Sequence, residues 1–252
     1  MSGAAESLVL VEGFDDRDFW KGLLLHLGCK EARKEPVAAH RQSPGFTYLT
    51  SSGALVHVIP LKALPGISKG AELQGIVAQK LKARAHKPFQ RLVVSPDADL
   101  YLTRESAAEG VGGMVLASCL DAKPNEDGDW LVDGGKLIVS ALFIHADAAK
   151  DGEGQWPAGV PAQPALEQLV CAALCRVYPD RGRAVAAWLG ARPAPTGKDH
   201  KAHAWSFYAG WSTDHGPGDF YGSMWRDEKI AAELRALLEK QRAWRVIEAL
   251  VA

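Results

Sequence analysis

The stretch Leu8-Val9-Leu10-Val11-Glu12-Gly13-Phe14-Asp15-Asp16 decides the fold of this chain. An apolar run of strand type ends in a glutamate and a glycine, and two further acids open a helical pattern. A carboxylate at the end of a buried strand is costly to desolvate unless a cation lies against it. A second apolar run, Leu92-Val93-Val94, leads to Asp97-Ala98-Asp99 in the same way. These two acidic strand ends predict a divalent-metal site at one edge of a parallel sheet.

Strand and helix patterns alternate through residues 1–150, and this alternation predicts an α/β fold with a mostly parallel sheet flanked by helices. The main apolar runs that predict strands are 7–12, 91–95 and 137–145. The segments that predict helices in this part are 15–28, 71–85 and 102–110. Short apolar runs at 46–49 and 55–60 predict a hairpin around Ser51-Ser52-Gly53, after a polar connector. The remainder of the chain is mostly helical in pattern and predicts a C-terminal helical extension.

Length and composition are those of an ordinary globular protein. The chain has 252 residues, a formal net charge of -1, 47% hydrophobic and 23% charged residues. No apolar run approaches the roughly 20 residues of a membrane span, and no signal-peptide pattern opens the chain, so we expect a cytoplasmic protein without a membrane partner. The near-neutral charge argues against nonspecific coating of nucleic acid but leaves room for a local basic groove. The four cysteines are expected to be free thiols rather than zinc ligands.

The acidic residues suit Mg²⁺, which prefers hard oxygen ligands. Asp97 and Asp99 are two residues apart, so in an extended segment they project to the same side and can share one ion. Asp16 lies four residues after Glu12 and can turn back toward the strand end. Capping is the alternative, since Asp15 and Asp16 suit the first turn of a helix and the Asp-x-Asp pair suits a cap or an Asx-turn. Glu12 fits that alternative poorly because glutamate is a poor N-cap.

Residues 11–20, Val-Glu-Gly-Phe-Asp-Asp-Arg-Asp-Phe-Trp, together with the apolar strand before Asp97-Ala98-Asp99, resemble a Toprim domain. This metal-binding α/β module occurs in topoisomerases, primases, recombination proteins and overcoming-lysogenization-defect (OLD) nucleases. The acids at positions 15 and 16 are most similar to small bacterial and archaeal Toprim-like proteins related to the OLD branch. The resemblance covers residues 7–178, which gives an expected Toprim-like core at 1–178 and a helical subdomain at 179–252.

The resemblance implies a set of site residues. It implies that Glu12 acts as general base or metal ligand, and that a lysine, Lys201 or Lys198, stabilises developing phosphate charge. The acids it implies around one or two ions of Mg²⁺ or Mn²⁺ are Glu12, Asp16, Asp97, Asp99 and Glu167. The OLD branch has a later leucine-glutamate pair, which Leu166-Glu167 matches here. Two prolines depart from the family pattern: Pro96 precedes the Asp-x-Asp, and Pro164 precedes this pair. No Gly-x-x-x-x-Gly-Lys-Ser motif occurs in this chain, so any coupling to ATP needs a protein partner.

Three functions are compatible with these residues. The first is a Mg²⁺-dependent Toprim-like phosphodiesterase that cuts DNA or RNA. The second is a non-catalytic Toprim-like module that binds a nucleotide or nucleic acid, or regulates a larger complex. The third is a flavodoxin-like α/β protein whose acids hold a phosphate-bearing ligand through Mg²⁺. The order of the sheet strands is expected to separate the third from the Toprim arrangement.

Several further residues have two interpretations. Glu167 is either a ligand or an exposed first-turn acid, and Lys198 and Lys201 are either functional or part of a solvated loop. His145, at the end of the third long strand, is either a ligand or base, or a satisfied and partly buried histidine, and Asp147 follows it at the same strand end. The aromatic residues between Trp205 and Trp225 either stack on bases or form the core of a helical cap, and core packing is the better-supported interpretation.

Overall fold

The computed structural model describes residues 5–37, 40–61, 69–86, 88–96, 101, 103–144, 165–191, 199–215 and 220–252. Contacts between residues divide the chain into two compact units. Unit 1 consists of Met1–Phe143 and Arg245–Ala252, and unit 2 consists of Ile144–Trp244. The contacts thus divide the chain at residues 143 and 244, whereas the sequence places a boundary at residue 178.

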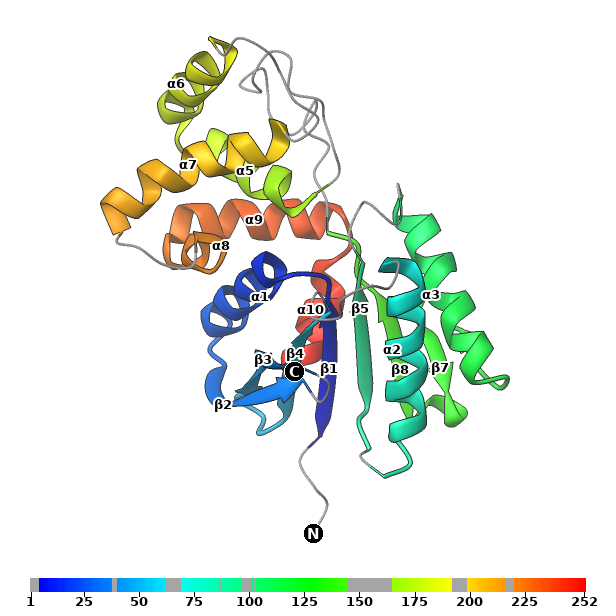
Figure 1. The fold of residues 1–252 in the computed structure, drawn as a ribbon. Helices are drawn as coiled ribbons and strands as arrows, with labels where there is room; N and C mark the ends of the chain where they lie inside the picture. Colours follow the sequence, from blue (N-terminus) through cyan, green and yellow to red (C-terminus); the bar gives the residue numbers. More distant parts are fainter. Residues whose placement is uncertain are drawn as a thin grey trace. The chain divides into compact units, whose positions relative to one another are not determined.

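Unit 1 is built on an eight-stranded mixed sheet with the order β2-β3-β4-β1-β5-β8-β7-β6 (Figure 1). Its strands are β1 (Glu6–Val11), β2 (Lys30–Val37), β3 (His40–Leu49), β4 (Leu55–Pro60), β5 (Arg91–Ser95), β6 (Lys123–Pro124), β7 (Trp130–Val132) and β8 (Leu137–Ala141). The four central strands β4, β1, β5 and β8 are parallel to one another. The outer pairings are antiparallel. The α/β class is confirmed, but the expectation of a mostly parallel sheet is wrong, because the antiparallel pairings outnumber the parallel ones among the described strands.

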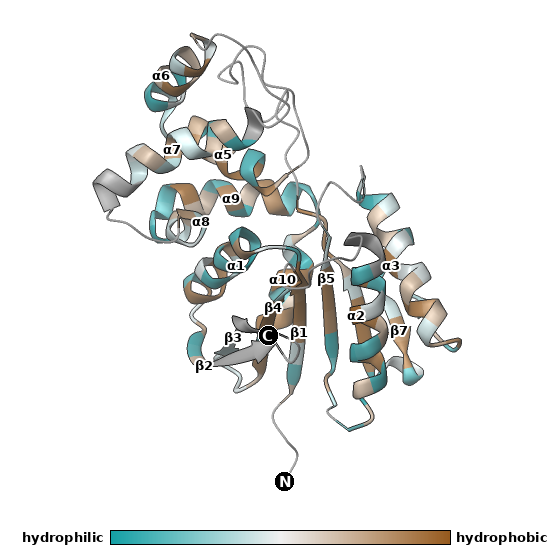
Figure 2. Ribbon diagram, in the orientation of Figure 1, coloured by the Kyte–Doolittle hydropathy of each residue, from teal (hydrophilic) through white to brown (hydrophobic). Residues whose placement is uncertain are grey.

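The parallel centre follows from strands that are apolar on both faces. Val9, Leu10 and Val11 of β1 are fully buried, which requires cover on both sides of the sheet. Figure 2 shows this apolar character along β1 and β5. The antiparallel edge follows from a short connection: β3 and β4 are joined by a turn in which Thr50 N donates to Ala54 O, and Gly53 has φ +84°. So short a connection permits only an antiparallel pair, and the predicted hairpin is confirmed.

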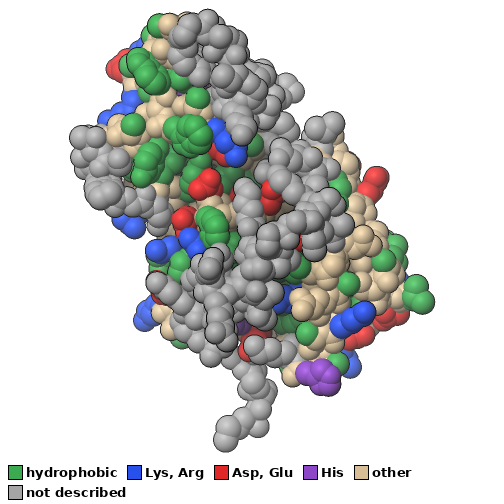
Figure 3. Space-filling model, viewed as in Figure 1, with side chains coloured by type: hydrophobic (Ala, Val, Ile, Leu, Met, Phe, Trp, Pro, Cys, Tyr) green, Lys and Arg blue, Asp and Glu red, His purple; other side chains and the backbone are tan. Residues whose placement is uncertain are grey.

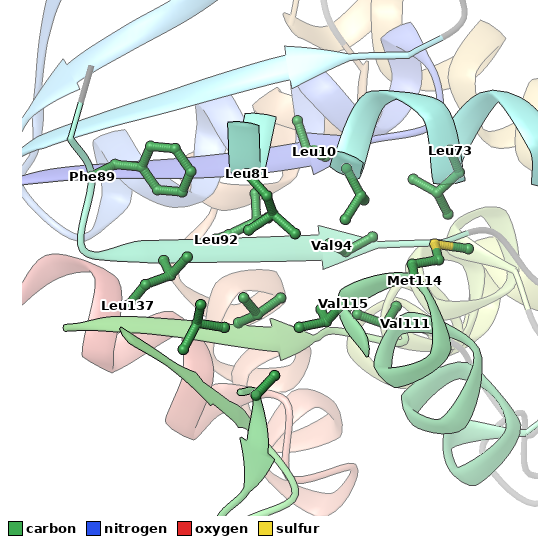
Figure 4. Close-up of a cluster of buried hydrophobic side chains, with 14 of the residues drawn as sticks. Leu10, Leu73, Leu81, Phe89, Leu92, Val94, Val111, Met114, Val115 and Leu137 are labelled. Carbon is green, nitrogen blue, oxygen red and sulfur yellow. The ribbon is translucent and has the colours of Figure 1, made fainter. Parts of the chain in front are cut away.

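Helices α2 (Lys69–Ala83) and α3 (Arg104–Ser118) lie on one face of the sheet, along β5 and β8 (Figure 1). The core between these elements is drawn in Figure 4. Leu92 and Val94 project from β5, Leu10 from β1 and Leu137 from β8, toward the two helices. Because successive strand residues alternate between faces, Val93 of β5 belongs to the opposite face, where it is 1% exposed.

Helix α10 (Trp244–Val251) contributes to the cover of that opposite face (Figure 1). From Arg245 onward this helix belongs to unit 1, although it lies at the C-terminal end of the chain. Arg245 donates from Nη1 to Asp129 Oδ2 at 2.8 Å and from Nη2 to Asp129 Oδ1 at 3.3 Å. Asp129 precedes β7 and is 6% exposed. A two-pronged contact between guanidinium and carboxylate therefore ties the last helix to the antiparallel edge of the sheet.

Unit 2 is helical throughout its described part. Its helices are α5 (Leu166–Val177), α6 (Pro179–Gly190), α7 (Asp199–His215), α8 (Phe220–Ser223) and α9 (Glu228–Lys240). Helix α5 packs on α6, α7 and α9 and is buried from Leu169 to Cys175. In the aromatic segment, Phe207 and Trp225 are buried, which confirms core packing for these two rings, whereas Trp205 and Tyr208 are exposed. Among the described residues, no helix has the length and apolar character needed to cross a bilayer.

Candidate functional site

The parallel strands end at one edge of the sheet, and Glu12 lies at that edge. Val11, the last residue of β1, is in register with Pro60 of β4 on one side and with Ser95 of β5 on the other. The backbone continues this alignment, because Leu61 N donates to Val11 O at 2.7 Å. Glu12 therefore leaves the sheet between the carboxyl ends of its two neighbours.

The chain reverses its direction across the sheet at this point. After β1 the chain forms β2, β3 and β4 on one side of β1, and it then crosses to β5 and later β8 on the other side. In open parallel sheets, such a switch point opens a crevice outside the carboxyl ends of the strands, and ligands bind there. Here the switch point lies between β1 and β5. Glu12 follows the first of these strands, and Ser95-Pro96 follows the second.

Glu12 is 7% exposed. Gly13, beside it, is also buried and begins the turn into helix α1 (Phe14–His26). An ionised carboxylate at such a position is costly unless cations or hydrogen-bond donors face it. Carboxylate oxygens are the ligands that Mg²⁺ and Mn²⁺ prefer, so the chemistry of this side chain fits a divalent ion.

Asp16 has a structural role that the sequence offered as an alternative. Its Oδ2 accepts a hydrogen bond from Gly13 N at 2.9 Å, which satisfies a donor at the start of α1. Asp15 in the same turn is exposed. Both acids also favour the positive end of the helix dipole. The capping interpretation is thus confirmed for Asp16, and a part in metal binding remains a prediction.

The other predicted acids after β5, Asp97 and Asp99, lie outside the described residues, as do Lys198, His145 and Asp147. Within the described part of the chain, no group of three or more histidine, cysteine, aspartate and glutamate side chains is placed to hold a metal ion. This result leaves the Glu12, Asp97 and Asp99 set untested, because two of its three members are outside that part.

In unit 2, two of the predicted residues lie together. Lys201 Nζ is 3.7 Å from Glu167 Oε1, and the two side chains are 38% and 13% exposed. Glu167 stands in the first turn of α5, as expected, but it is largely buried rather than solvated. Lys201 stands on α7, so its placement in a solvated loop is wrong. The pair brings a cation and an acid into the same part of unit 2.

A buried histidine lies two residues beyond Lys201. The ring of His203 is fully buried and packs 5.1 Å from the ring of Phe207. Burial lowers the pKa of His203 to about 4, so the imidazole is neutral at pH 7. Burial also raises the pKa of the Cys171 thiol on α5. The four cysteines are free, as predicted, and three of them are buried.

A stack of rings and a guanidinium lies at the start of α1 and was not predicted. The Arg17 guanidinium lies 5.0 Å from the ring centre of Phe14 and 4.7 Å from that of Phe46 on β3. It also donates to Asp18 Oδ1 from Nε at 3.1 Å and from Nη2 at 2.9 Å. Phe14 is 39% exposed. The only sequence signal for this stack is an aromatic residue directly after the Glu-Gly pair.

Charged side chains are mixed on the described surface. On the face drawn in Figure 3, lysine and arginine are interspersed with aspartate and glutamate. This mixture agrees with the net charge of -1. No protein-family model, curated protein or solved structure matches this chain.

Proposed function

We propose that this protein is a Mg²⁺- or Mn²⁺-dependent, Toprim-like phosphodiesterase that acts on DNA or RNA. The observation that carries the proposal is the burial of Glu12 at the carboxyl end of β1, beside the switch point between β1 and β5. The sequence that follows β5 contains Asp97-Ala98-Asp99. Acids after both strands that flank a switch point are what a metal-assisted phosphate site requires.

The proposed chemistry assigns one task to each group. Glu12 and the Asp-x-Asp pair hold one or two ions, with Asp16 as a further candidate ligand. Ions bound there would supply Lewis-acid polarisation of the phosphate. Glu12 is the candidate base that would take the proton from the attacking water, whose oxygen then bonds to phosphorus. The bond from phosphorus to the leaving oxygen breaks, and that oxygen takes up a proton. Bound cations would also offset the negative charge that develops on the phosphate.

Glu167 and Lys201 enter the proposal through the family resemblance. Their 3.7 Å ion pair in unit 2 supports a shared role, with Lys198 as the alternative cation. A structural ion pair between two helices would give the same contact. Lys201→Met distinguishes a catalytic role of this lysine from a purely structural one. Loss of a catalytic lysine lowers turnover more than it lowers the free energy of unfolding.

The proposal is tested by Glu12→Gln and Asp97→Asn in the full chain. Cleavage of labelled single-stranded and duplex DNA and RNA is measured with Mg²⁺, with Mn²⁺ and with a chelator. We expect the parent to cleave only with metal, and each variant to lose activity by about 10²-fold or more. Glu105→Gln is the matched control, because Glu105 is an exposed acid in the first turn of α3, the helix after β5. Thermal unfolding verifies that all variants are folded.

Two outcomes contradict the proposal. One is a parent protein that cleaves no substrate with either metal. The other is Glu12 and Asp97 variants that cleave as well as the Glu105 control. In the first case, binding of nucleotide or nucleic acid without hydrolysis indicates the non-catalytic module instead.

One observation favours a further candidate. Numbered along the chain, the parallel strands have the order 2-1-3-4, which is how the flavodoxin-like order begins. That arrangement supports a protein that holds a phosphate-bearing ligand through Mg²⁺ without cutting nucleic acid. Calorimetry with Mg²⁺ and a nucleoside monophosphate, compared between the parent and Glu12→Gln, detects such binding independently of any cleavage.

A further inference from the structure

Phe14 lies two residues after Glu12, the central residue of the proposed metal site. Glu12 and Phe14 are two residues apart, so their backbones are separated by no more than about 7 Å. Phe14 opens α1 and is 39% exposed, whereas Phe19 and Trp20 on the same helix are fully buried. Its ring therefore contributes surface at the sheet edge rather than to the core.

We infer that Phe14 is a positioning residue on which a base of the nucleic-acid substrate stacks, next to the phosphate at the sheet edge. This inference rests on the proposed function and extends it, because it assigns a contact to the base. A flat ring presents a π-face to any of the four bases, and such stacking is largely independent of sequence. The contact thus predicts a preference for unpaired bases without a preference for a particular base.

The ring is held in place by its neighbours. The Arg17 guanidinium contacts the rings of both Phe14 and Phe46, at 5.0 Å and 4.7 Å from their centres. Asp18 fixes the guanidinium through two hydrogen bonds to one oxygen, and only 16% of the Arg17 side chain is exposed. A platform that is ordered before binding loses little conformational entropy when a base stacks on it. Lys21, 5.6 Å from the centre of the Phe46 ring, adds a second cation beside the stack.

The cations explain why a nucleic acid fits better than an apolar peptide. Arg17 and Lys21 lie on the same helix as Phe14, one and two turns along it. Positive charge beside a partly exposed aromatic ring is the combination by which proteins hold single strands: the bases stack and the backbone phosphates face cations. An apolar peptide gains nothing from the charges.

The test compares two single-stranded probes of equal length and charge, measured by fluorescence anisotropy with Ca²⁺ in place of Mg²⁺. One probe is a labelled thymidine oligonucleotide, and the other is the same sugar-phosphate backbone without bases. Phe14→Ala should weaken binding of the first probe roughly 5- to 150-fold, the range for loss of one stacked base, and leave the second unchanged. Phe14→Trp should restore or strengthen binding of the first probe. Leu25→Ala is the matched control, because Leu25 lies on the same helix and is 41% exposed.

The inference is overturned if the parent binds both probes equally, or if Phe14→Ala weakens both or neither. A parent that binds neither probe also overturns it. Thermal unfolding of each variant excludes a loss of fold as the cause. Failure of the nuclease proposal appears elsewhere, as absence of metal-dependent cleavage, so a protein that stacks bases on Phe14 without cutting them remains a distinguishable result.

Discussion

Acidification should destabilise this protein through His203. The pKa of this buried imidazole is lowered to about 4, against about 6.5 in an unfolded chain, and the cause is burial. Between these values the unfolded state binds a proton that the folded state excludes. The stability is therefore complete above pH 6.5 and falls as the pH drops toward 4. At 1.36 kcal/mol for each pKa unit, the whole effect is about 3 kcal/mol, of which about 2 kcal/mol is lost between pH 7 and pH 5.

The assay is urea unfolding of the full chain at pH 7 and pH 5, followed by circular dichroism and by tryptophan fluorescence. His203→Gln removes the titrating group, so its loss of stability over this interval should be about 2 kcal/mol smaller than that of the parent. His86→Gln, which replaces an exposed histidine, should behave as the parent does. Equal pH dependence in the parent and His203→Gln would refute the reasoning, as would an NMR titration of the His203 ring near pH 6.5.

Two predictions concern packing and the last helix. Gly112→Ala should destabilise the protein by about 1–3 kcal/mol, because the added Cβ would lie 2.4 Å from Trp130 Cζ2. The Cβ of Gly113→Ala would meet nothing within 4 Å, so this variant should stabilise α3 by up to about 1 kcal/mol. Thermal unfolding of the two neighbouring variants checks this contrast, and equal shifts would contradict it. Arg245→Met should cost about 1–2 kcal/mol, less than for a fully buried pair because Arg245 is 42% exposed. Urea unfolding measures this loss of stability, and Arg242→Met serves as an exposed control. A double variant that combines Arg245→Met with Asp129→Asn should be little less stable than Arg245→Met alone.

The central strands were predictable because their burial leaves a continuous apolar run in the sequence. The edge strand β2 was not. β2 at one edge has the sequence KEARKEPV, and its charges and proline are what an edge strand tolerates and a central strand does not. The sequence therefore favours a connector there. Helix α3 extends to Ser118, beyond the predicted end at residue 110. Glycines weaken a helical pattern in the sequence, but Gly112 within this helix permits close packing against Trp130.

The candidate site was predictable to the extent that it depends on strand ends. Glu12 stands out because an acid directly after an apolar run has few structural explanations, and its burial agrees with that reasoning. Asp16 differs from Glu12 because helix capping is sufficient to explain its position, as its hydrogen bond from Gly13 N indicates. The stack at Phe14 was not predictable, because Phe46 comes from β3 and only the fold places its ring beside Arg17.

Strand order is what connects the two acidic segments. Glu12 and Asp97 are 85 positions apart, and nothing in the composition of either segment relates one to the other. β1 pairs with β4 on one side and β5 on the other, which puts the residues after β1 and after β5 at the same switch point. If β5 had been added beyond β4 instead, β4 would lie between these two strand ends, and two inter-strand spacings would separate them by about 10 Å. The metal proposal therefore depends on the parallel register of Val11 with Ser95 more than on the acidity of either segment.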